Sequence, residues 1–168
     1  MTKLEELKFE DKNTQKIVDF IVGIGIPVHT MKIEEDTFLP GILIKDGGIY
    51  IDIDKMKYPG DLLHEAGHLA TLEPKKRMEV YNDVSKNPGD EVSTIAWSYA
   101  AAKYIHIDLD ILFHGNGYKG DSSWLREHYS RGGELAVPLL EWMGFTSQKI
   151  KASREIDAFP NMKKWLRE

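Results

Sequence analysis

The segment YPGDLLHEAGHLATLEP, residues 58–74, contains two histidines four positions apart, with a glutamate directly after the first. Four residues of an α-helix make about one turn, so the imidazoles of His64 and His68 would project from one face and hold one metal ion. Glu65 lies one position along, beside that pair. Two nitrogen ligands with an adjacent carboxylate form the H-E-x-x-H arrangement, in which zinc is held by the histidines and the glutamate acts as a general base.

The alternative interpretation is a helix with two solvent-facing histidines and an ordinary surface glutamate. The neighbours of the motif argue against it, because they are apolar: Leu62, Leu63, Leu69 and Ala70. Gly67 is also unexpected, since glycine inside a helix costs about 1 kcal/mol relative to alanine. We therefore expect a mostly buried helix, with another element approaching it closely at Gly67. Zinc is the predicted cofactor, bound by His64 and His68, with Glu65 as the catalytic base.

A catalytic zinc site needs one more protein ligand than this motif supplies. The candidates are Glu73, Glu79, Asp83, Asp90, Glu91, His106, His114 and His128. We favour Glu91, because in the helix predicted from NPGDEVSTIAWSYAAAKYI it falls in line with Ile95 and Tyr99, on the stripe that should face the core. A carboxylate there is costly to bury without a partner such as a metal ion. The alternative is a first-turn glutamate favoured by the helix dipole, with Asp90 as the helix cap.

The HEAGH motif and Glu91, which leads the segment EVSTIAWSYAAAKYI, resemble the minimal gluzincin-type zinc peptidases, and most of all the ImmA/IrrE-type metallopeptidases. The resemblance covers roughly residues 42–105 and is strongest in the two helices. It implies a compact zincin-like domain in which His64, His68 and Glu91 hold zinc. In such a domain Glu65 activates water for the cleavage of peptide bonds.

The segment FHGNGYKGDSSW, residues 113–124, is rich in glycine and polar residues and is predicted to be a functional loop. Hydrolysis at a metal commonly uses a tyrosine, histidine or arginine to stabilise the oxyanion. His114 or Tyr118 is our hypothesis for that role. The alternative is that both are ordinary polar residues of a surface loop.

The apolar pattern around these residues predicts one α+β domain spanning residues 1–168. A first helix is predicted from NTQKIVDFIVGIGIPV, and Asp61 is the expected N-cap of the histidine helix. Alternating isoleucines at about residues 42–53, around the turn Asp46-Gly47-Gly48, predict a hairpin in a small antiparallel sheet packed on that helix. The family resemblance implies that the strand at residues 49–53 borders the cleft and pairs with an extended peptide substrate.

Composition excludes several other classes. The chain has 168 residues, 27 acidic and 22 basic, with a net charge of -5 and no basic patch suited to nucleic acid. It has no cysteine, so a transition-metal site must use histidine and carboxylate. The start, MTKLEELKFEDKNTQ, lacks the plan of a signal peptide, and no run approaches the roughly 18 apolar residues of a membrane span. A cytoplasmic protein is therefore expected.

Three functions remain open from the sequence, and the weakest of them is a metal-dependent enzyme that acts on a non-peptide amide. The leading prediction is a zinc-dependent hydrolase that cleaves a peptide or protein substrate. The rival is a zincin-fold regulatory or interaction module that keeps zinc without catalysis. Glu65 favours the enzyme, because a merely structural site has no use for a general base. The pattern leaves substrate specificity and oligomeric state open.

Overall fold

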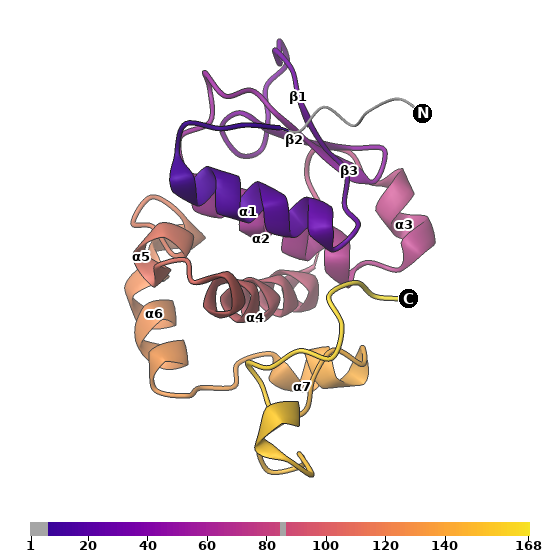
Figure 1. Cartoon of the computed structure of the whole chain (residues 1–168), viewed down its shortest axis with the longest axis vertical. Helices are drawn as coiled ribbons and strands as arrows, with labels where there is room; N and C mark the ends of the chain where they lie inside the picture. The colour runs from indigo at the N-terminus through magenta and orange to yellow at the C-terminus, as the bar shows by residue number, and fades with distance from the viewer. Residues whose placement is uncertain (1–6, 85–86) are drawn as a thin grey trace.

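The computed structural model describes residues 7–84 and 87–168 of the chain (Figure 1), so the beginning of the leader MTKLEELKFEDKNTQ lies outside the described residues. The α-helices are α1 (Lys12–Gly23), α2 (Pro59–Thr71), α3 (Pro74–Glu79), α4 (Pro88–Ile105), α5 (Leu109–Leu112), α6 (Ser122–Ser130) and α7 (Val137–Trp142). The strands are β1 (Val28–Thr30), β2 (Ile42–Lys45) and β3 (Gly48–Ile51), and two short 3-10 helices are η1 (Tyr118–Gly120) and η2 (Glu155–Asp157). None of the helices in the described ranges is both long enough and apolar enough to cross a bilayer.

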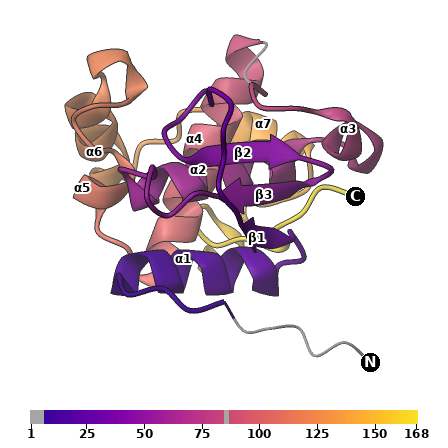
Figure 2. The same ribbon diagram turned by 90° about the horizontal axis from the view of Figure 1, so that it is seen from above.

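The predicted α+β class is confirmed, but the sheet is mixed rather than antiparallel. Its strands lie in the order β1-β3-β2 (Figure 2). β2 and β3 form the predicted hairpin, with Ile42 opposite Ile51, whereas β1 pairs with β3 in parallel, with Val28 beside Ile49. The sequence does not indicate β1, because this strand has three residues, of which only Val28 is buried, and no alternation to detect.

β3 is therefore the central strand, and the expected pairing of a substrate with it is wrong. Its two hydrogen-bonding edges are already occupied by β1 and β2. The strand also ends at Ile51, so that Ile53, expected to continue the buried face, is 53% exposed. Of the two hairpin strands, β2 is the one at the outside of the sheet.

Helix α2 is enclosed by other elements along its whole length. Every residue from Gly60 to Thr71 is buried. The helix packs against α1 and α4, and it also contacts β3 and α5 (Figure 1). The predicted burial of the histidine helix is thus confirmed, and α2 can hold polar side chains in a place from which bulk water is largely excluded.

Glycines let two neighbouring helices approach α2 closely. A Cβ atom added at Gly67 would lie 3.0 Å from Thr94 Cγ2 and 3.0 Å from a ring carbon of Trp97, both on α4. A Cβ atom added at Gly60 would collide with the backbone carbonyl of Ile111 in α5. The close approach expected at Gly67 is confirmed, and the approaching element is α4.

The start of α2 differs from the prediction. Tyr58 is the N-cap residue and Pro59 opens the helix, where its fixed φ and missing N–H are tolerated. Asp61 therefore lies inside the first turn instead of capping it, and it is buried. This shift turns Asp61 from a solvent-facing cap into an interior carboxylate on the same helix as the histidines.

Candidate metal centre

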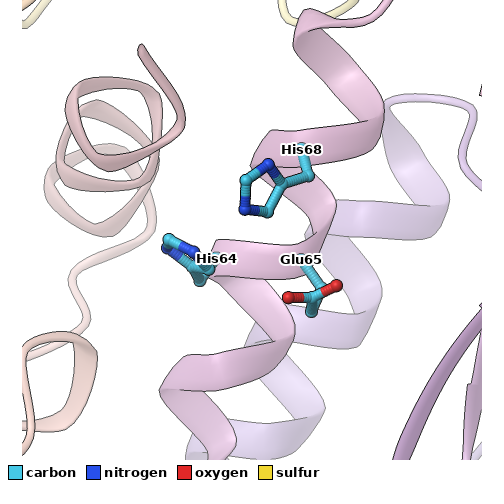
Figure 3. Close-up of side chains that lie close together, drawn as sticks. All are labelled: His64, Glu65 and His68. Atoms are coloured by element: carbon cyan, nitrogen blue, oxygen red, sulfur yellow. The ribbon is translucent and has the colours of Figure 1, made fainter. Parts of the chain in front are cut away.

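Three side chains of α2 form the centre of the site (Figure 3). The ligand atoms of His64, Glu65 and His68 lie within 4.8 Å of one another. The exposed fractions of these residues are 7%, 3% and 2%. The helical spacing of the motif is what brings them together, as the sequence predicted.

Glu91 comes from the first turn of α4 and contacts both imidazoles. Its Oε1 lies 3.2 Å from Nε2 of His64, and its Oε2 lies 3.0 Å from Nε2 of His68. Two ligand atoms that share a tetrahedral zinc ion at about 2.0–2.1 Å are separated by about 3.3 Å. Each of the two nitrogen–oxygen distances is therefore close to the separation of two ligands on one zinc ion, and histidine nitrogen with carboxylate oxygen is a donor set that suits this ion.

The predicted position of Glu91 is correct only in part. Its side chain is 35% exposed, so it is less deeply buried than the core stripe of α4. Asn87 is the N-cap residue of α4, and its side chain accepts a hydrogen bond from the backbone of Asp90. The alternative with Asp90 as the helix cap is therefore wrong, and the contact of Glu91 with the two histidines goes beyond what a helix dipole requires.

Electrostatics favours a negative carboxylate between the two rings. Burial raises the pKa of Glu91, but the hydrogen bonds to His64 and His68 outweigh this and hold that pKa well below its ordinary value. Burial also lowers the pKa of His64, yet the hydrogen bond and charge of Glu91 raise it overall. For His68 burial prevails and the pKa is lowered. An anionic oxygen ligand thus faces a histidine that favours the neutral, metal-binding form.

Thr94, one turn beyond Glu91 on α4, fixes the ring of His68. Its Oγ1 lies 3.1 Å from Nδ1 of His68. A histidine that binds metal through Nε2 carries its proton on Nδ1, and Thr94 is then the acceptor that selects this tautomer. The sequence contains no signal for this contact, because only the crossing of α2 and α4 creates it. Nδ1 of His64 is buried with no hydrogen-bond partner among the described residues.

Replacing Thr94 with valine should lower zinc affinity by about 10–100-fold, because the hydroxyl acceptor is lost while the side-chain shape is kept. Competition with a chromophoric chelator would measure the affinity. Thr94→Ser restores the hydroxyl and should recover most of the binding. Equal affinities for the wild type and Thr94→Val would show that this contact does not orient His68.

Burial raises the pKa of Glu65 to about 8, and the negative charges of Asp61, Glu91 and Asp83 add to the effect, whereas His64 opposes it. In the metal-free protein Glu65 therefore keeps a proton at neutral pH. A nearby cation would stabilise the ionised carboxylate and lower this pKa, since opposite charge favours the charged form. The charge state of the predicted base is thus coupled to occupancy of the site.

The metal-free protein should lose stability as the pH rises from about 4.5 to about 8. The folded state keeps the Glu65 proton over this window, whereas the unfolded chain, with the ordinary pKa of 4.5, releases it. Glu65→Gln removes this titration, so its free energy of unfolding should exceed that of the wild type by an amount that grows by about 1 kcal/mol per pH unit. Urea unfolding with a chelator at pH 5 and pH 8 would measure this. Glu79→Gln, an exposed change on α3, controls for net charge, and a gap that stays constant with pH would contradict the expectation.

The two candidates from the predicted loop lie in different positions relative to the histidines. Tyr118 packs edge-on against His64, with 5.4 Å between ring centroids. Its hydroxyl oxygen is buried and has no hydrogen-bond partner among the described residues. Burial and the charges of Asp61, Glu91 and Glu65 raise the pKa of Tyr118 well above 10. The hydroxyl therefore stays protonated and available as a donor.

His114 lies next to Tyr118 but contacts Asp61 rather than His64 or His68. Its Nε2 lies 2.7 Å from Oδ1 of Asp61, and its ring stacks on Tyr58 with 4.0 Å between centroids. Segment 113–124 is thus not an irregular surface loop, because it includes η1 and the start of α6, and the contacts of His114 with Asp61 and of Tyr118 with His64 place it beside α2. Asp61 was not among the predicted site residues, although its position one turn before Glu65 could have indicated a shared face.

Two other histidines considered as the third ligand have different roles. His106 ends α4 in the left-handed conformation and is exposed. His128 accepts a hydrogen bond from the backbone N–H of Leu135 and stacks on Trp124. Neither contact involves the α2 site.

Compared with models of known families, with curated proteins and with solved structures, the chain matches none. The functional assignment therefore depends on the geometry of the site itself.

Proposed function

We propose that this protein is a zinc-dependent peptidase in which His64, His68 and Glu91 hold the ion and Glu65 is the general base. The observation that carries the proposal is the approach of the Glu91 carboxylate to both Nε2 atoms, at 3.2 Å and 3.0 Å, from a second helix. Two buried histidines facing one anionic carboxylate form a ligand set that a divalent ion would complete. The contact of Thr94 with His68 supports it, because metal-binding histidines usually have such a partner.

Bound zinc would polarise the scissile carbonyl and acidify a water molecule. Glu65 is adjacent and would take the proton from that water and deliver it to the departing amine. Tyr118 has a protonated hydroxyl with no partner among the described residues, which makes it a donor for the carbonyl oxygen as negative charge develops. The burial of the α2 side chains strengthens these interactions by excluding water.

A peptide substrate is proposed because two histidines four residues apart on a helix, with a glutamate between them as the general base, are the arrangement of zinc peptidases. The outer edge of β2 does not contribute to this, because the backbone N–H of Asn82 donates to the carbonyl of Ile44 at 2.8 Å and the N–H of Ile42 donates to the carbonyl of Leu39 at 3.2 Å.

The proposal is tested by digesting a broad peptide library with the zinc-loaded protein and detecting new termini by mass spectrometry. Cleavage should stop when a chelator removes zinc and return when zinc is added. Metal analysis should give one zinc per chain. Absence of stoichiometric metal would overturn the whole site. One zinc per chain without cleavage of any peptide would favour the regulatory or interaction module.

A further inference from the structure

A buried carboxylate and histidine form a second polar pair next to the proposed zinc ligands. Asp61 Oδ1 and His114 Nε2 are 2.7 Å apart, and the side chains are 7% and 11% exposed. Asp61 is on α2, one turn before Glu65, while His114 follows α5, so the two helices must pack for the pair to form. A contact this short between a carboxylate and an imidazole is a strong hydrogen bond, and it costs desolvation of both groups.

The polar atoms left without a partner lie in this same region. Among the described residues, the buried side-chain nitrogen and oxygen atoms that have no hydrogen-bond partner are Nδ1 of His64, Nδ1 of His114 and Oη of Tyr118. The ring of Tyr118 lies 5.4 Å from that of His64 and 6.4 Å from that of His114, so it stands next to both. An unpaired buried polar atom costs about 1–3 kcal/mol. A ligand that pairs with these atoms would recover that cost.

The backbone next to His114 is held in an unusual conformation. Tyr118 and Lys119 have φ values of 57° and 53°, which residues other than glycine seldom adopt. A Cβ atom added at Gly117 would lie 3.1 Å from Cε1 of His114, so the glycine lets the segment close over that ring. Strain of this kind persists where the surrounding structure imposes it, commonly at ligand-binding segments.

We propose that Asp61 is a positioning residue that orients His114, that the unprotonated Nδ1 of His114 accepts a hydrogen bond from a backbone N–H of the peptide substrate, and that Tyr118 Oη donates to the scissile carbonyl. The inference rests on the proposed peptidase function. Because Nε2 is held by Asp61, Nδ1 is the ring nitrogen left for substrate. Asp61 also selects the tautomer, as a carboxylate does for a catalytic histidine elsewhere. The rings of His114 and Tyr118 lie 6.4 Å apart, so the pair offers the substrate backbone one acceptor and one donor.

The test is a double-mutant cycle on the zinc-loaded protein, with Asp61→Asn, His114→Ala and the double variant. Each single variant should lower kcat/KM by about 10–100-fold, and the double variant should be no worse than His114→Ala, because Asp61 acts only through that ring. Zinc content should stay at the wild-type value in all three. His114→Gln replaces His114→Ala if the alanine variant does not fold.

Asp52→Asn is the matched control. Asp52 is also a buried carboxylate, and it accepts a hydrogen bond from the backbone N–H of Ile33 instead of one from a histidine. This variant should unfold at lower urea concentration while kcat/KM stays at the wild-type value. If Asp52→Asn loses as much kcat/KM as Asp61→Asn does, the loss comes from general destabilisation of the fold, and the inference is overturned.

A proton NMR spectrum separates failure of this inference from failure of the proposed function. The Nε2–H of His114 bonded to Asp61 should give a downfield imidazole resonance in the wild type that is absent in Asp61→Asn and in His114→Ala, with or without zinc. Additive losses in the cycle, or loss of zinc in Asp61→Asn, would overturn the positioning role while the peptidase function stands. A wild type that shows the resonance but no cleavage dependent on Glu65 would overturn the peptidase function, and the inference with it.

Discussion

Glu65→Gln should retain one zinc per chain and lose peptide hydrolysis by about 100–10,000-fold. The amide keeps the size and most hydrogen-bonding capacity of the carboxylate but cannot accept the proton of the attacking water, and a positioned general base contributes about 100–10,000-fold to a rate. The side chain is 3% exposed, so solvent cannot easily replace it as the base. Initial rates on the best peptide from the library, measured beside metal analysis, would give both quantities.

The stability of the same variant is the internal control for this experiment. In the metal-free state, Glu65→Gln should be at least as stable as the wild type at pH 8, since it removes a carboxylate whose pKa burial raises to about 8. Reduced activity would then not come from unfolding. Wild-type rates in Glu65→Gln would rule out Glu65 as the base and, if zinc remains bound, would leave the peptidase proposal without its central residue.

Glu91→Ala should lower zinc affinity by more than about 100-fold. This effect is larger than the one expected for Thr94→Val, because Thr94 contacts a ligand and not the ion. The carboxylate is the negatively charged member of the ligand set, and it contacts both Nε2 atoms. Its removal leaves two neutral nitrogen ligands, which hold zinc weakly because neither of them offsets the positive charge of the ion. Equilibrium dialysis against zinc, or competition with a chelator, would measure the difference.

Asp90→Ala is the matched control for Glu91→Ala, because it makes the same change in net charge one residue earlier in the same helix. Asp90 is bonded to the Asn87 side chain rather than to a histidine. This variant should keep nearly full zinc affinity. If Glu91→Ala binds zinc as tightly as Asp90→Ala does, another residue is the third ligand, and the close approach of Glu91 to the histidines is an ion pair of the metal-free protein.

The fold follows the sequence where a periodic apolar pattern is long enough to read. Helix α2 and the hairpin of β2 and β3 are predicted because their buried faces repeat at the helical and strand periods. β1 is missed because it has three residues and one buried side chain, so its strand conformation comes from pairing with β3. The same pairing moves β3 to the centre of the sheet and leaves β2 on the outside.

The sequence by itself determined the local half of the site, since His64, Glu65 and His68 are brought together by one helical turn wherever that helix lies. It also suggested Glu91, through the register of a second helix. Only the tertiary structure decided that the Glu91 carboxylate reaches both Nε2 atoms, that Thr94 contacts His68 and that Asp61 holds His114. The physical reason is that these contacts join residues 23 to 53 positions apart in the chain, so they depend on how α4 and α5 cross α2. The glycines at 60 and 67 permit these close crossings but do not specify their geometry.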